Sequence, residues 1–157
     1  MSVVLVDANA AIMHGRAFSE RVRQAVASGT TVVLPQSVKR ELVDDVLAAE
    51  QAPENHKAAA RDIQTLIDEG SLVIRAPEYQ TYSDLIDEAR RRIADDDLPE
   101  HAVKADQYIP ALTCELAETT SVQVVTADKK LQETIRTIVS RQGVGDQVTI
   151  HQPRTIL

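Results

Sequence analysis

Short runs of apolar, mostly β-branched residues alternate along the chain with longer segments whose apolar residues recur at helical spacing. Most of these runs lack the strict alternation of apolar and polar residues that a half-exposed strand shows, which favours strands covered on both faces by helices. The pattern predicts five buried strands, at residues 3–6, 31–34, 72–74, 122–126 and 148–150. We therefore expect an α/β fold with a mainly parallel, five-stranded sheet.

The segments between the runs predict amphipathic helices that pack one stripe inward, such as the stripe of Val38, Leu42 and Val46. Glycines follow three of these segments, at Gly29, Gly70 and Gly143, where a left-handed C-terminal cap is expected. The acidic stretch at residues 95–99 interrupts the helical pattern between residues 82 and 118 and is predicted to be a turn.

Length and charge limit what the chain can do. Its 157 residues fit one domain, spanning 1–157. Seventeen basic against 24 acidic residues give a net charge of −7, so a nucleic-acid site must be local or metal-assisted. The acidity itself is typical of a solubility device or of adaptation to a salty cytoplasm.

Cysteine content and apolar run length indicate the compartment. The single cysteine, Cys114, excludes an intrachain disulfide and a multi-cysteine zinc site, and fits a reducing cytoplasm. No apolar run approaches the roughly 20 residues needed to cross a bilayer, so we expect no membrane association.

Two acids stand directly beyond predicted strands. Asp7 closes the first run in VVLVDAN, and Asp128 follows the fourth in VQVVTAD. An ionised carboxylate after a buried run is costly unless a cation or a donor pairs with it. Either acid could instead cap the helix that follows.

Three further acids lie on predicted helices. Glu41 and Asp45, in SVKRELVDDVL, are expected to border the buried stripe, whereas Asp44 points outward. Asp106 precedes Pro110 by four residues, and because the proline ring would clash with the Asp106 carbonyl, a kink or a new helix start is expected there. Ion pairing or solvation explains each acid taken singly, so the joint pattern carries the inference.

Four segments, VVLVDAN, LPQSVKREL, KADQYIPALTCELA and VVTADKKL, resemble the signatures of PIN domains in the family's order, from residue 3 to about residue 131. The resemblance implies a three-layer α/β/α sandwich and a nuclease acting on single-stranded or structured RNA. It assigns Asp7, Glu41, Asp106 and Asp128 to the acidic site, with Asn9 and Thr126 as supporting polar groups. Many members carry a further Asp where this chain has Lys130, which leaves a fourth carboxylate and a second metal in doubt.

Converging carboxylates repel one another, and a divalent cation relieves that repulsion. Oxygen-only ligands favour Mg²⁺ or Mn²⁺. The hypothesis is in-line hydrolysis of an RNA phosphodiester, in which Asp7, Asp106 and Asp128 hold the metal and Glu41 orients the nucleophile or completes a second site. Asp45 is an extra candidate acid, and Lys39, Arg40, Lys129 and Lys130 are candidate RNA contacts, whereas the run at residues 90–92 is more typical of a charged helix face.

Three alternatives stay open on sequence alone. The nuclease is either the toxin of a toxin–antitoxin pair, with an antitoxin partner, or a housekeeping RNA-processing factor. The third alternative is a non-catalytic PIN-like scaffold that binds RNA or a protein in RNA processing or ribosome assembly, which Lys130 favours. A homodimer is expected from the resemblance, although no exposed apolar stripe identifies its interface.

Overall fold

The structure is a computed structural model that describes residues 2–94 and 103–153. Its centre is one sheet of five strands: β1 (Ser2–Val6), β2 (Thr31–Pro35), β3 (Leu72–Arg75), β4 (Ser121–Val125) and β5 (Val148–His151). The strands run parallel in the order β3-β2-β1-β4-β5, so the predicted fold class and all five predicted strands are confirmed. The turn predicted at residues 95–99 lies outside the described residues.

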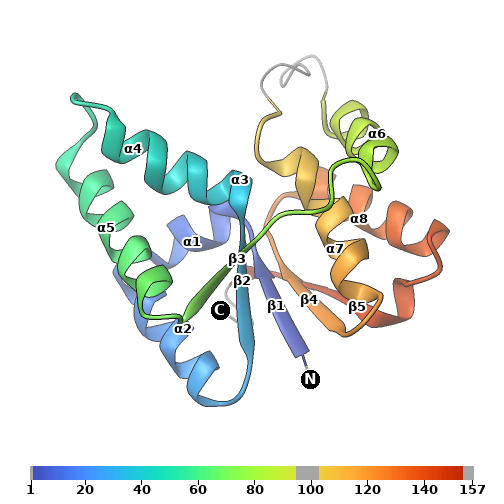
Figure 1. Cartoon of the computed structure of the whole chain (residues 1–157), viewed down its shortest axis with the longest axis horizontal. Helices are drawn as coiled ribbons and strands as arrows, with labels where there is room; N and C mark the ends of the chain where they lie inside the picture. The colour runs from blue at the N-terminus through green and yellow to red at the C-terminus, as the bar shows by residue number, and fades with distance from the viewer. Residues whose placement is uncertain (1, 95–102, 154–157) are drawn as a thin grey trace.

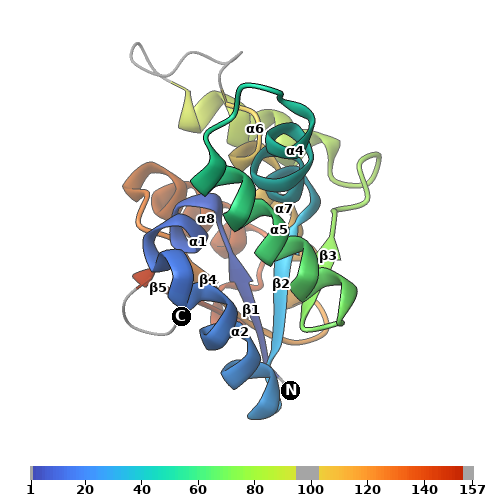
Figure 2. The same cartoon turned by 90° about the vertical axis from the view of Figure 1, so that its left-hand side faces the viewer.

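Helices cover both faces of the sheet (Figure 1). The first face carries α1 (Ala8–His14), α2 (Phe18–Ala27) and α5 (Glu54–Asp68), with α3 (Gln36–Lys39) and α4 (Asp45–Ala48) above them, as Figure 2 shows from the side. The second face carries α6 (Ser83–Ile93), α7 (Ile109–Ala117) and α8 (Lys129–Arg141). Short helical turns complete the fold: η1 (Gly15–Ala17), η2 (Arg40–Asp44), η4 (Asp106–Tyr108) and η5 (Gly145–Gln147).

Burial explains why the central strands read as unbroken apolar runs. In β1 every residue from Val3 to Val6 is buried, because helices pack against both faces. The edge strands β3 and β5 are covered less completely and include exposed residues. Of the helices in the described ranges, none is long and apolar enough to span a membrane.

The predicted helix ends are confirmed. Gly29, Gly70 and Gly143 have φ values of 91°, 82° and 77°, the left-handed geometry expected just beyond a helix. Near Pro110 the chain forms the 3₁₀ turn η4 and then starts α7 at Ile109, which places the proline in the first turn, where it needs no hydrogen-bond donor.

The helix around Glu41 differs from the sequence prediction. Residues Arg40–Asp44 form a π-helical turn, η2, between α3 and α4. Because a π turn bonds each carbonyl five residues on, Val43 is buried together with Val38, whereas the predicted stripe members Leu42 and Val46 are only partly buried. The predicted stripe is therefore confirmed for Val38 and in part for Leu42 and Val46, which pack against the core, but it missed Val43. Glu41 and Asp45, which were expected to border the buried side, are exposed.

Candidate functional site

The two strand-end acids lie at the point where the strand order of the sheet reverses. β1 is followed by β2 and β3 on one side, whereas β4 and β5 lie on the other. The backbone N–H of Asp7 donates to the Val125 carbonyl at 3.3 Å, which fixes the end of β1 beside the end of β4. In open parallel sheets, ligands bind in the crevice beyond the carboxyl ends at such a switch point.

Asp7 and Asp128 each cap the helix that follows. One Asp7 oxygen, Oδ1, accepts from the Ala10 N–H at 2.8 Å at the start of α1, and Asp128 Oδ1 accepts from the Leu131 N–H at 3.1 Å at the start of α8. The alternative explanation of these acids as helix caps is thus correct, yet it does not exclude a second role, because both caps lie at the switch point.

Thr126 links the two acids. Its buried hydroxyl oxygen accepts from the Asp128 N–H at 3.1 Å, and its hydroxyl hydrogen-bonds the Asp7 carboxylate. Gln132 supports this loop, since its Nε2 donates to the Thr126 carbonyl at 2.7 Å. Gln132 was not a sequence candidate, although a glutamine four residues after Asp128 is a sequence signal that could have drawn attention to it. Asn9 is exposed in α1 and makes no hydrogen bond to the four acids in the described structure.

Asp106 joins the site from the other side of the crevice. It is partly buried in η4, and the preceding Ala105 carbonyl accepts a hydrogen bond from the Ser37 hydroxyl in α3 at 3.0 Å. The pKa of Asp106 rises to about 7 because of burial and then because of the negative charges of Asp7, Asp128 and Glu41. Asp106 therefore lies close enough to each of the other three predicted acids for their charges to act on it.

The pKa of Asp7 is also raised, and burial is the largest cause. The side chain is 2% exposed, the hydrogen bonds from Thr126 and Ala10 lower its pKa in part, and the charge of Asp128 raises it further. Every group that shifts the Asp106 pKa does so upward. Unrelieved negative charge of this kind is a feature of sites that receive a cation.

The ligand atoms that the candidate residues offer are of the type that a hard divalent ion prefers. All four candidate side chains offer carboxylate oxygens, which Mg²⁺ and Mn²⁺ prefer. Within residues 2–94 and 103–153, however, no three His, Cys, Asp or Glu side chains are gathered closely enough to hold an ion. Oδ1 of Asp7 and Oδ1 of Asp128 each accept a hydrogen bond from a helix N–H, which leaves Oδ2 of each carboxylate as the second oxygen.

The remaining candidates lie around this acidic centre. Lys39 donates to Asp44 at 3.0 Å, and Arg40 is exposed on η2. Lys129 is exposed at the start of α8, and Lys130 lines a groove between α6 and α8. Asp45, at the start of α4, is not among the charges that shift the Asp106 pKa.

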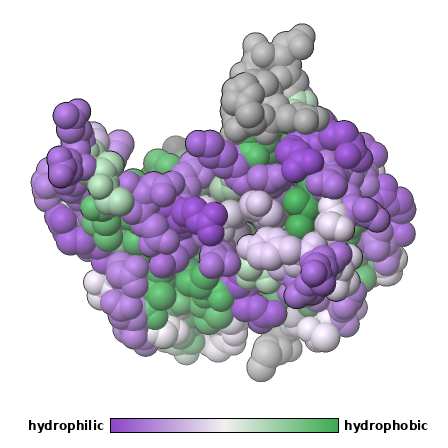
Figure 3. All heavy atoms as spheres, turned by 45° about the horizontal axis from the view of Figure 1, so that its top comes forward, coloured by the Kyte–Doolittle hydropathy of each residue, from purple (hydrophilic) through white to green (hydrophobic). Residues whose placement is uncertain are grey.

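An apolar hollow of about 680 Å³ opens beside Glu41, between α1–α2 and α4–α5. Its lining includes Ile12, Phe18, Leu42 and Val46, and the Ile12 side chain is 63% exposed. The sequence shows no exposed apolar stripe, whereas the fold assembles this apolar surface from separate segments of the chain. Figure 3 shows the molecule with the top of Figure 1 turned toward the reader; hydrophilic residues cover most of this face, and hydrophobic areas lie between them.

Comparison with known families decides the classification. The sequence profile of the family described as Halobacterial PIN domain matches residues 1–157. The chain belongs to this PIN-domain family. No curated protein matches the sequence. Among solved structures, one described as FitAB bound to an IR36 DNA fragment is similar to this PIN domain at 17% identity and a TM-score of 0.46, covering 96% of this chain and 94% of that chain.

Proposed function

We propose that this chain is a single PIN domain acting as a divalent-metal-dependent endoribonuclease that hydrolyses RNA phosphodiester bonds. PIN domains are in general nucleases, which sets the class. The observation that carries the proposal is the pKa of Asp106, raised to about 7 by burial and by the charges of Asp7, Asp128 and Glu41 at the switch point of the sheet. A site built this way favours binding of a cation over an empty state.

Each acid has a role in this proposal. Asp7, Asp106 and Asp128 hold Mg²⁺ or Mn²⁺, which when bound polarises the phosphodiester and lowers the pKa of a water. Glu41, on the exposed π turn, accepts a proton from the attacking water or orients it. Thr126 hydrogen-bonds the Asp7 carboxylate and accepts from the Asp128 backbone N–H, which holds the two residues side by side. Burial of Asp7 limits the number of orientations its carboxylate adopts.

The test compares cleavage of a 5′-labelled RNA by the unmodified protein, Asp7→Asn, Asp106→Asn and the matched control Asp45→Asn. We expect cleavage that requires Mg²⁺ or Mn²⁺ and stops on chelation, a loss of at least about 100-fold in the first two variants, and no loss in the control. If Asp7→Asn cleaves as fast as the unmodified protein, the acidic site is not the source of the activity.

The apolar hollow beside Glu41 favours a second function that depends on a protein partner. In this alternative the chain is a non-catalytic PIN-like scaffold in an RNA-processing or ribosome-assembly complex. In a second form of this alternative, the chain is a nuclease that is regulated by a protein bound at the hollow, either an antitoxin or a second copy of the chain. Ile12→Asp would then abolish the complex and leave RNA cleavage by the isolated protein unchanged, as measured by co-purification with the protein encoded directly upstream and by light scattering for the homodimer.

A further inference from the structure

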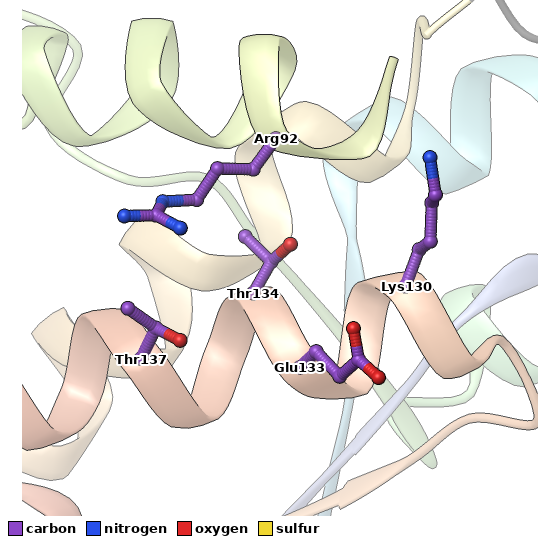
Figure 4. A pocket seen from close by; sticks show the side chains of 5 residues that line it. All are labelled: Arg92, Lys130, Glu133, Thr134 and Thr137. Atoms are coloured by element: carbon purple, nitrogen blue, oxygen red, sulfur yellow. The ribbon is translucent and has the colours of Figure 1, made fainter. Parts of the chain in front are cut away.

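A polar groove between α6 and α8 lies outside the acidic site. This α6–α8 groove has a volume of about 310 Å³ and is lined by Arg92, Lys130, Glu133, Thr134 and Thr137. Figure 4 shows Arg92 reaching from α6 so that its guanidinium lies over α8 near Thr134 and Thr137, whereas the Glu133 carboxylate points away from that guanidinium. The groove therefore presents basic and hydroxyl groups on one side.

Charge is distributed unevenly between this region and the rest of the chain. Helix α8 carries Lys129, Lys130, Arg136 and Arg141 against the single acid Glu133, a net charge of +3 in a chain whose net charge is −7. The groove itself is lined by two basic side chains, Arg92 and Lys130, against the single acid Glu133, so it is locally basic in an acidic chain, as the binding of RNA phosphates requires.

An ion-pair network holds Arg92 in position. The Glu88 carboxylate accepts from Arg92 Nε at 2.7 Å and from Arg141 Nη1 at 2.9 Å, so one acid is shared between two guanidinium groups. The positive charge of the trio exceeds its negative charge by one. Because Glu88 takes only the Nε of Arg92, the two Nη groups stay directed along the groove. Such a fixed guanidinium can donate two hydrogen bonds to a phosphate.

Along α8 the groove begins at Lys130, two residues beyond Asp128 of the acidic site. Asp128 caps α8 and Thr137 lies nine residues further along, which at 1.5 Å per residue is about 14 Å. That distance corresponds to roughly two to four nucleotides of a single strand, depending on how far the strand is extended. Groups at this spacing would contact backbone phosphates next to the cleaved one.

We propose that the α6–α8 groove binds the phosphate backbone of the RNA strand on one side of the cleaved bond. Arg92 donates to one phosphate, and the exposed Thr137 hydroxyl donates to it or to its neighbour. This assignment rests on the proposed function, which supplies the RNA strand and the cleaved bond. An acidic protein segment fits the groove less well, because none of its five lining residues is the aliphatic or aromatic anchor that protein interfaces use.

The test places a negative charge in the groove by Thr137→Glu. Thr137 is exposed and glutamate favours helix more than threonine does, so the fold is expected to persist. Thr65→Glu is the matched control, since Thr65 is also exposed on a helix, α5, on the opposite face of the sheet. Both changes are made in the Asp7→Asn protein, so that binding of a fluorescein-labelled 20-nucleotide RNA is measured by anisotropy without cleavage.

We expect Thr137→Glu to weaken RNA binding about tenfold and to reduce the slope of log affinity against log salt by about 0.7 for each lost phosphate contact. Arg92→Gln is expected to do the same more weakly, and Thr65→Glu to match the parent. Salt is varied only over the range in which circular dichroism shows each variant folded.

This design tests RNA binding by the groove separately from RNA cleavage by the acidic site. Equal affinity and equal salt slope for Thr137→Glu and Thr65→Glu would overturn the groove assignment even if the unmodified protein cleaves RNA. Absence of RNA binding by the Asp7→Asn parent at about 100 µM would overturn it too. Displacement of the RNA by polyglutamate at equal charge concentration would refute the choice of RNA. Loss of binding in Thr137→Glu without cleavage by the unmodified protein would support the groove and refute the nuclease.

Discussion

The Thr126 hydroxyl oxygen accepts a hydrogen bond from the Asp128 N–H at 3.1 Å, which leaves its one proton to donate to the Asp7 carboxylate. Thr126→Val keeps the side-chain shape and removes both contacts. We expect metal affinity and RNA cleavage to fall by about tenfold, the range found when partners of metal ligands are removed. Stability should fall by about 1–2 kcal/mol, because the Asp128 N–H and Asp7 lose buried partners.

Thr126→Ser is the control for this prediction, because it restores the hydroxyl at the cost of one methyl group. Mn²⁺ affinity, measured by calorimetry, should return to within about twofold of the unmodified protein. If the valine and serine variants bind Mn²⁺ equally, the hydroxyl does not position the acids.

Without a bound cation, the folded protein should show the effect of repulsion at Asp106. Its pKa is about 7 in the folded protein and 3.8 in a free side chain, so ionising it costs free energy only in the folded state. This cost appears as the pH rises from about 4 and is complete above about 7. The metal-free protein should therefore lose stability across that window, on the order of a few kcal/mol from this group.

Asp106→Asn should abolish that loss and raise the melting temperature in EDTA at pH 8, whereas the exposed control Asp45→Asn should leave it unchanged. Mn²⁺ should raise the melting temperature of the unmodified protein more than that of Asp106→Asn, because only the unmodified protein keeps all the proposed metal ligands. A melting temperature in EDTA that is lower for Asp106→Asn than for the unmodified protein would refute repulsion at this site.

Glu88 should give the opposite pH dependence. Arg141 and Arg92 hold its pKa at about 2, below the free value of 4.5. The ionised Glu88 carboxylate therefore stabilises the folded state above pH 4.5, and this stabilisation is lost as the pH falls toward 2. We expect Glu88→Gln to lower the free energy of unfolding by about 1 kcal/mol at pH 7, an amount reduced by solvent screening, and the difference to shrink below pH 4.5.

Urea unfolding at pH 7, 5, 4 and 3 measures this difference, with Glu54→Gln as the control, since Glu54 pairs with Arg61 at an exposed position. A pH-independent deficit in Glu88→Gln would indicate lost packing and not a lost ion pair.

The sheet and two of the acids were predictable because they depend on local patterns. Strands covered on both faces need unbroken apolar runs, and parallel pairing then brings the residues after β1 and β4 to one edge. The positions of Asp7 and Asp128 at one edge of the sheet follow from that rule alone. Asp106 and Glu41 needed the resemblance to the PIN family as well, because a helical acid has no pattern that indicates which cleft it borders.

What the sequence did not reveal depends on packing between distant segments. The π turn at Arg40–Asp44 shifts the buried position from Leu42 to Val43, and no periodicity in this short segment distinguishes the two. The hydrogen bond from Ser37 to the Ala105 carbonyl joins residues 68 apart. Gln132 is near Asp128 in sequence, yet the sequence does not show that α8 buries this side chain against the Thr126 carbonyl.

Gln132 supports the loop that carries Asp128, since its Nε2 donates to the Thr126 carbonyl at 2.7 Å in a buried setting. Gln132→Leu keeps a similar volume and leaves that carbonyl without its donor. We expect a loss of about 1–3 kcal/mol, which in a chain of this length lowers the melting temperature by roughly 2–10 °C. Mn²⁺ affinity should also fall several-fold, because Asp128 is then held less firmly.

The matched control is Gln142→Leu, the same chemical change at an exposed position that ends α8. It should leave both the melting temperature and the Mn²⁺ affinity close to those of the unmodified protein. A drop in melting temperature for Gln132→Leu with unchanged Mn²⁺ affinity would mean that this glutamine stabilises the fold without orienting Asp128. A drop in both, absent from the control, would place Gln132 among the residues that position the acidic site.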